Sequence, residues 1–223
     1  MQETVFHSQR LRNRSVKIAG SALLGAMAFL LQTFVKFPFP LLPWLVFDLA
    51  EIPTVVAFLL FGPVWGILSS ALLFLIMVMR GSSFPPGPYM KLIAIVSMQV
   101  GIWLGFKLAG RLGVVSIRSM FASGLAAGLI SRALVMTPVN YLVVGVLFAS
   151  DFYFKTATKS LTLVGITLAS QDQFIVLMLI LSALYNALHV FLSVVPTIAI
   201  TRVTPIVRQS WLMENFKTKI QKI

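Results

Sequence analysis

The sequence predicts an all-α, polytopic membrane protein with six transmembrane helices. Of its 223 residues, 58% are hydrophobic and only 11% are charged, whereas about 25% of the residues of a soluble domain are charged. The mean hydropathy is +0.94. Six apolar runs alternate with polar or proline-rich segments, and about 20 apolar residues suffice to cross a bilayer core. We therefore expect a single membrane domain over residues 1–223.

The predicted spans cover residues 16–35, 52–61, 63–79, 89–108, 120–148 and 173–201. No small-residue cleavage pattern follows the first span, so we expect it to be retained rather than removed as a signal peptide. Its small residues recur four apart, Ser21 with Gly25 and Ala22 with Ala26. Small residues at this spacing let another helix approach closely in lipid, which would serve internal packing and contact with another protein equally well.

The segments between the spans carry further predictions. Lys36–Pro43 contains three prolines and cannot be the interior of a helix, so we expect a structured apolar loop that packs over another part of the protein. Asp48 and Glu51 have the spacing of a capping box, which predicts Asp48 as the N-cap of the second span, with contact to a ligand as the alternative. Residues 150–172 are expected to form either a surface helix or an ordered loop.

The basic residues predict the orientation in the membrane. The net charge is +12, which by itself would be compatible with nucleic-acid binding. Six spans place both termini on one side, and 12 of the 18 Lys and Arg residues fall on that side, against five on the other and Arg132 within a span. Cytoplasmic loops of membrane proteins are enriched in Lys and Arg. We therefore expect both termini in the cytoplasm, and membrane lipid rather than nucleic acid as the surroundings.

Several kinds of chemistry are disfavoured by the residue content. The chain has no cysteine, which excludes disulfides, thiolate metal ligands and a thiol nucleophile. Its two histidines are far apart in the sequence and the predicted spans contain no carboxylate pair, so neither a metal site nor acid–base catalysis is expected. A phosphate-binding glycine-rich loop is also missing from the sequence.

The polar residues inside the apolar runs predict a ligand site instead. Asn186 and His189 are three apart and therefore share one side of a helix, and Asn140 lies in the outer half of the preceding span. Amides and an imidazole in apolar surroundings suit a planar heterocycle with polar edges. Arg132, also within a span, is either a structural anchor or a functional charge.

Four groups of residues resemble the motifs of a known protein family in their order and spacing. They are residues 22–30, residues 38–40 with 47–53 and 61–66, residues 132–141, and residues 185–189. These stretches are similar to those of the riboflavin-binding substrate-binding components (S components) of energy-coupling factor (ECF) transporters, the RibU family. The similarity extends over most of the chain.

The resemblance implies a six-helix RibU-like fold that binds a vitamin, riboflavin above all, at the outer side of the plasma membrane. It implies no enzyme activity and no cofactor, since ATP would be hydrolysed by two cytoplasmic ATPases that work with a transmembrane coupling subunit, EcfT. Ala22 and Ala26 would form the surface on which EcfT docks. The implied ligand contacts are Asn140, Asn186, His189, Tyr141 and Gln99, with Trp44 and Leu45 covering the ligand from the outer loop.

Two positions depart from the family pattern. His189 stands where the family usually has lysine, and Leu72–Leu75 is apolar where the family commonly has a Lys–Asn pair. An S component for another vitamin or a flavin analogue is therefore an alternative. Two others are a membrane-embedded enzyme that uses Arg132 and His189, and a structural subunit without a ligand.

Overall fold

The computed structural model describes residues 13–81, 86–113, 116–147, 151–203 and 211. Its helices are α2 (Arg14–Phe34), α3 (Glu51–Phe61), α4 (Pro63–Met79), α5 (Pro86–Arg111), α6 (Ile117–Asn140), α7 (Asp151–Thr162) and α8 (Gln171–Val203), and a π-helical turn, η1 (Tyr141–Leu147), continues α6. Two strands, β1 (Lys36–Phe39) and β2 (Leu42–Asp48), lie between α2 and α3. Most of the basic tails used to predict the orientation, and part of the proline-rich loop after Arg80, lie outside the described residues.

Helices account for most of the described chain, which confirms the predicted helical class. Four of them are long and apolar enough to cross a membrane, namely α2, α5, α6 together with η1, and α8. The apolar helices α3 and α4 are shorter, with 11 and 17 residues. The described chain is therefore that of a multi-pass membrane protein, and the crossing of α3 and α4 stays a prediction.

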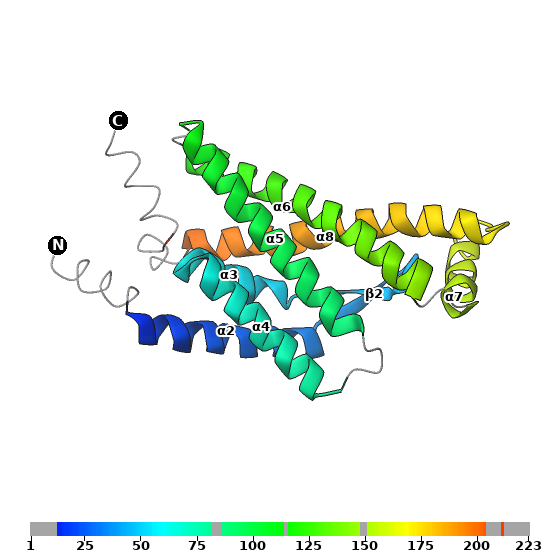
Figure 1. Cartoon of the computed structure of the whole chain (residues 1–223), viewed down its shortest axis with the longest axis horizontal. Helices are drawn as coiled ribbons and strands as arrows, with labels where there is room; N and C mark the ends of the chain where they lie inside the picture. The colour runs from blue at the N-terminus through cyan, green and yellow to red at the C-terminus, as the bar shows by residue number, and fades with distance from the viewer. Residues whose placement is uncertain (1–12, 82–85, 114–115, 148–150, 204–210, 212–223) are drawn as a thin grey trace.

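The helices form a bundle with two different ends (Figure 1). α2, α3 and α4 pack against one another, α4 also contacts α5, α5 packs along α6, and α8 contacts both α6 and α3. The start of α2 and the end of α8 lie at one end, whereas the β-hairpin and α7 lie at the other. Residues far apart in the sequence therefore meet at the hairpin end of the bundle.

Close packing of α5 on α6 depends on small residues at their interface. A β-carbon on Gly105 would lie 2.5 Å from the carbonyl oxygen of Ser123, and one on Gly101 would lie 2.5 Å from that of Ala127. The Ser123 hydroxyl also donates to the Gly105 carbonyl at 2.8 Å. Such close helix approach is how apolar helices associate in lipid, where hydrophobicity gives no preference for helix over lipid.

Gly105→Ala is expected to destabilise the protein by about 1–3 kcal/mol, because the added methyl group meets backbone that cannot move aside locally. Helix propensity alone would favour alanine by about 1 kcal/mol, so the two effects have opposite signs. The measurement is thermal unfolding in detergent, with Leu104→Ala as a control at an exposed position of the same helix. A raised melting temperature for Gly105→Ala would contradict the tight interface.

The proline-rich segment after α2 is a β-hairpin, where the sequence predicted a structured loop. β1 and β2 pair antiparallel, with Lys36 opposite Asp48 and an irregularity between Pro38 and Phe39. Proline is tolerated here because both strands of a two-stranded sheet are edge strands. The expectation that this segment packs over another part of the protein is confirmed, since Phe39, Leu42 and Phe47 are buried in one cluster with residues of α7 and α8.

The capping-box prediction for Asp48 and Glu51 is wrong. α3 begins at Glu51, its N-cap is Ala50, and no side chain caps it. The Asp48 carboxylate instead accepts from the backbone nitrogen of Ala50 at 3.0 Å and binds Lys91. Both acids are buried, with Asp48 5% and Glu51 0% exposed, which helix capping alone does not require.

Residues 151–162 form helix α7, and turns and irregular chain follow up to residue 170. Of the two alternatives predicted for this segment, the helix is therefore the one that occurs. Tyr153, Ala157 and Leu161 are buried and four residues apart, so they lie on one face of α7. That face packs against Trp44 and Phe174 in the hairpin cluster. Helix α7 thus packs against β2.

Candidate functional site

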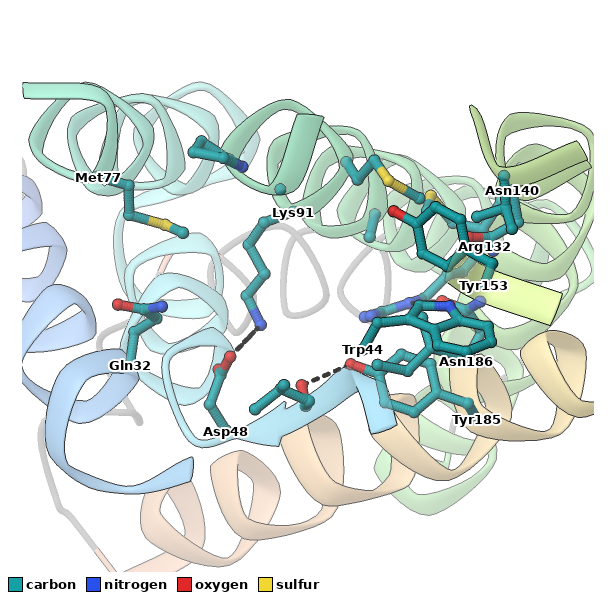
Figure 2. A pocket seen from close by; sticks show the side chains of 18 residues that line it. Gln32, Trp44, Asp48, Met77, Lys91, Arg132, Asn140, Tyr153, Tyr185 and Asn186 are labelled. Atoms are coloured by element: carbon teal, nitrogen blue, oxygen red, sulfur yellow. Dashed lines mark hydrogen bonds and ion pairs between the residues drawn. The ribbon is translucent and has the colours of Figure 1, made fainter. Parts of the chain in front are cut away.

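A cavity of about 260 Å³ lies at the hairpin end of the bundle (Figure 2). It is bounded by the ends of α2 and α4, β2, the start of α5, the second half of α6, η1, α7 and the middle of α8. The lining residues are Gln32, Trp44, Leu45, Val46, Asp48, Met77, Gly87, Pro88, Met90, Lys91, Ala94, Arg132, Met136, Asn140, Val144, Tyr153, Tyr185 and Asn186. Apolar walls with a few placed polar groups are typical of small-molecule sites.

Aromatic rings gather on one side of the cavity. Figure 2 shows Trp44, Tyr153 and Tyr185 together there with Asn140 and Asn186, whereas Gln32, Met77, Lys91 and Asp48 lie on the other side. The Trp44 and Tyr153 rings meet edge to face, 5.0 Å apart. Burial raises the pKa of the Tyr153 hydroxyl, so this ring stays uncharged at neutral pH. Flat apolar surfaces of this kind favour a planar ligand.

Two buried donors on the aromatic side have no partner among the described residues. They are Nδ2 of Asn140 and Nε1 of Trp44, and Asn140 is only 1% exposed. A buried donor without an acceptor costs about 1–3 kcal/mol. Both side chains line the cavity, so a ligand that offers acceptors to them would remove this cost.

A network of charges connects the two sides of the cavity, with Lys91 and Asp48 on one side and Arg132 on the aromatic side (Figure 2). Lys91 Nζ lies 2.8 and 2.9 Å from the two carboxylate oxygens of Asp48, and 3.1 Å from Oε1 of Glu51. Arg132 Nη1 donates to Oε2 of Glu51 at 2.6 Å, and its Nε donates to Oδ1 of Asn186 at 2.9 Å. Glu51 therefore joins the two cations of the lining, Lys91 and Arg132.

Asn186 is held by this network and by its own helix. Its Oδ1 accepts from Arg132, while its Nδ2 donates to the Ser182 carbonyl one turn earlier at 2.8 Å. Asn186 thus faces the cavity with a fixed orientation of its amide. Arg132, predicted to be either an anchor or a functional charge, bonds Asn186 and Glu51 and so anchors both side chains. It also lines the cavity, and its role as a functional charge stays a prediction.

His189 lies behind the cavity wall. It is fully buried, with Nδ1 3.0 Å from the Tyr185 hydroxyl and Nε2 3.2 Å from the Asp48 carbonyl oxygen. Tyr185 in turn donates to the Val46 carbonyl at 2.6 Å. Together, His189 and Tyr185 attach β2 to α8 and thereby fix the strand that carries Trp44 and Asp48.

The structure brings together four of the seven ligand contacts that the family resemblance implies. Asn140, Asn186, Trp44 and Leu45 line the cavity. Tyr141 is 46% exposed on the outside of η1, and it does not line the cavity. Gln99 is buried between α3, α4 and α5, where its Nε2 donates to Thr54, Gly66 and Ser70. His189 lies on α8 one turn after Asn186 and supports the cavity wall from behind through Tyr185 and Asp48.

Sequence reasoning missed several residues of the cavity. Lys91 counted only as an outer basic residue, and Asp48 was interpreted as a helix cap. Glu51, which lies behind the cavity wall and does not line it, was interpreted in the same way. Tyr153 lies in the segment whose structure was undecided, although its four-residue spacing with Ala157 and Leu161 is visible in the sequence. Glu51 lies at the edge of one apolar span and Arg132 lies inside another. Because a lone charge within a span usually has a partner, this combination could have suggested an ion pair between them.

The fold is that of an ECF-transporter S component. A solved structure described as the S component of a bacterial ECF transporter matches with a TM-score of 0.63, covering 85% of this chain and 95% of that one at 24% identity. Among curated proteins, the riboflavin transporter RibU of Staphylococcus aureus (strain TCH60) is 29% identical over 175 residues, which is 77% of this chain and 89% of that protein. No protein-family model matches the chain. The resemblance indicated by the sequence is thereby confirmed.

Proposed function

We propose that this protein is the substrate-binding subunit of an ECF-type vitamin importer and that it binds riboflavin in the cavity under the hairpin. The observation that carries the proposal is the pair of buried donors, Asn140 Nδ2 and Trp44 Nε1, that lack acceptors and line an aromatic cavity. The similarity to RibU of Staphylococcus aureus supports riboflavin as the ligand.

The isoalloxazine ring of riboflavin fits the chemistry of this side of the cavity. It is planar, it carries carbonyl oxygens and ring nitrogens that accept hydrogen bonds, and it can stack on aromatic side chains. Asn140 and Trp44 would donate to the ring, and Asn186 would contact it from a position fixed by Arg132. Trp44 and Leu45 of β2 would cover the ligand, as the family resemblance implies.

We further propose that six helices cross the plasma membrane, with both termini in the cytoplasm and the cavity open to the outside. The excess of basic residues toward the termini supports this orientation. It is also supported by the placement of the hairpin and α7 at the opposite end from the start of α2 (Figure 1). α3, with 11 residues, would be the shortest of the six spans.

A direct binding measurement tests the proposed ligand. The full chain is purified in detergent, and riboflavin fluorescence is followed as protein is added. We expect strong quenching that saturates at one flavin per chain, because stacking on Trp44 and Tyr153 would quench the ring. Absence of quenching, together with absence of a flavin in the mass spectrum of bound small molecules, would reject riboflavin. A different bound vitamin would support the alternative S component.

The enzyme alternative receives no support from the arrangement of its two residues. Arg132 and His189 both contact Glu51, and His189 does not line the cavity. In our proposal the chain performs no catalysis, and ATP is hydrolysed by two ATPases that act with the coupling subunit EcfT.

The proposed docking surface for EcfT lies on α2. Ser21 and Gly25 face inward, where a β-carbon on Gly25 would lie 2.8 Å from the Ser69 carbonyl oxygen. Ala22 and Ala26 face outward and are exposed. The two stripes of small residues thus have different surroundings, and only the outer stripe is free to accept a helix of another subunit.

Ala26→Trp is expected to prevent assembly with the coupling subunit and the ATPases, because a large ring would hold the two helices apart. Riboflavin binding by the isolated variant should stay within about twofold of the original, since substitutions at distant sites act independently. Co-purification with the tagged coupling module is the measurement. Ala126→Trp, an equal change at an exposed position of α6, is the matched control and should leave assembly intact.

A further inference from the structure

The charges that face the cavity are already paired with one another. Asp48, Lys91 and Arg132 line it, and Glu51 lies directly behind them with no exposure. Lys91 is bound by both carboxylates and Arg132 by Glu51. Two cations therefore face two anions, and the group has no net charge when His189 is counted as neutral.

We propose that this balanced group of charges makes the cavity selective for an uncharged ligand, and that Asp48 sets the selectivity by neutralising Lys91. The proposal deepens the proposed function and rests on it. Riboflavin carries no charge at neutral pH, whereas its phosphate monoester, flavin mononucleotide, carries a charge of about −1.5 to −2. The two compounds share the same ring and differ at the end of the side chain.

The physical reason lies in the burial of the charges. A phosphate group in the cavity would lose its water. Among the described residues of the lining it would find no cation without a carboxylate partner. It would either lie beside Asp48 and Glu51, which repel it, or displace Asp48 from Lys91 and leave that carboxylate buried and unpaired. Both arrangements are costly, because an uncompensated buried ion costs several times more than a neutral polar group.

Lys91 is nevertheless well placed to bind an anion if it were released. Its side chain is 12% exposed, which is more than the side chain of either acid that holds it. It is also the cation on the side of the cavity opposite the aromatic rings (Figure 2), where the side chain of a flavin would extend. Asp48→Asn keeps an oxygen that can accept from Ala50, so it removes the charge with little change in shape.

The test compares the affinities of the purified full chain for riboflavin and for flavin mononucleotide, by fluorescence quenching at constant ionic strength. We expect the original protein to bind the phosphate ester at least about 100-fold more weakly. In Asp48→Asn the ratio of the two dissociation constants should fall by about tenfold or more, because the phosphate gains Lys91 as a partner. In Lys91→Gln the ratio should rise, because Asp48 loses its counter-ion.

Asp172→Asn is the matched control, since it removes one acidic charge at an exposed position at the start of α8 and should leave the ratio unchanged. Equal affinities of the original protein for both flavins would overturn the proposal while leaving riboflavin binding intact. A ratio that is the same in Asp48→Asn and Asp172→Asn would remove Asp48 from its assigned role. Binding of neither flavin would instead reject the proposed function. If Asp48→Asn fails to fold, the original protein and Lys91→Gln still decide the outcome.

Discussion

Glu51→Leu is expected to lower the free energy of unfolding by about 3–5 kcal/mol, the cost of leaving a buried charge without its partner. The Glu51 side chain is fully buried, and it accepts from Arg132 at 2.6 Å, from Ser193 at 2.9 Å and from Lys91 at 3.1 Å. Without it, Arg132 would remain 2% exposed with only Asn186 and the weakly accepting sulfur of Met98 as partners. Thermal unfolding in detergent, combined with denaturant titration, measures the loss.

The double variant Glu51→Leu with Arg132→Met should be less destabilised than the sum of its single variants, by about 0.5–3 kcal/mol. It removes one negative and one positive charge, and Lys91 keeps Asp48 as its partner. Asp172→Asn controls for the loss of an acid at an exposed position and should change stability by less than about 0.5 kcal/mol. Strictly additive losses in the double variant would show that Glu51 and Arg132 do not act as a pair.

The same network shows why local patterns misjudged Asp48 and Glu51. Three residues apart near the start of an apolar helix, they have the spacing of a capping box. The contact that determines the role of Glu51 is with Arg132, which lies 81 positions further along the chain. A pairing over that distance depends on how α3 and α6 are arranged in space, and no periodicity within either segment contains this information.

The helices were more predictable because each depends on its own stretch of chain. Apolar runs bounded by prolines, glycines and charges indicated six helical regions, and helices occur in all six. The hairpin at Lys36–Asp48 was missed because its prolines argue against regular structure. Its stability comes instead from contacts across the fold, such as the bond from Tyr185 to Val46.

Part of the cavity was visible in the sequence as polar residues in apolar runs. Asn140 and Asn186 both line it, although they come from different helices. His189, one turn after Asn186, faces the end of β2 instead. Three residues of helix turn the side chain by about 300°, and this difference is enough to separate a residue of the cavity wall from one that supports the wall.

Asn140→Leu is expected to weaken riboflavin binding by about 10- to 100-fold, because a hydrogen bond in a dry cavity is worth about 1–3 kcal/mol. The ligand-free protein should be as stable as the original or more stable. In the original protein, Nδ2 of Asn140 is a buried donor without an acceptor among the described residues. Replacing the side chain therefore removes an energetic cost and breaks no hydrogen bond of this donor. Affinity is measured by flavin quenching and stability by thermal unfolding without ligand.

Gln99→Leu is the matched comparison, since it also replaces a buried amide in the same bundle. Its Nε2 has three acceptors in the ligand-free protein, the closest being Ser70 Oγ at 3.2 Å, whereas its Oε1 is buried without a donor among the described residues. The bonds of Nε2 outweigh this one unpaired acceptor, and Gln99 does not line the cavity. We therefore expect lower stability with little change in affinity, the reverse of Asn140→Leu. An amide that serves the fold loses stability when removed, whereas an amide reserved for a ligand loses affinity. If both variants lost stability equally, Asn140 would have a structural role and the proposed contact with the flavin ring would be rejected.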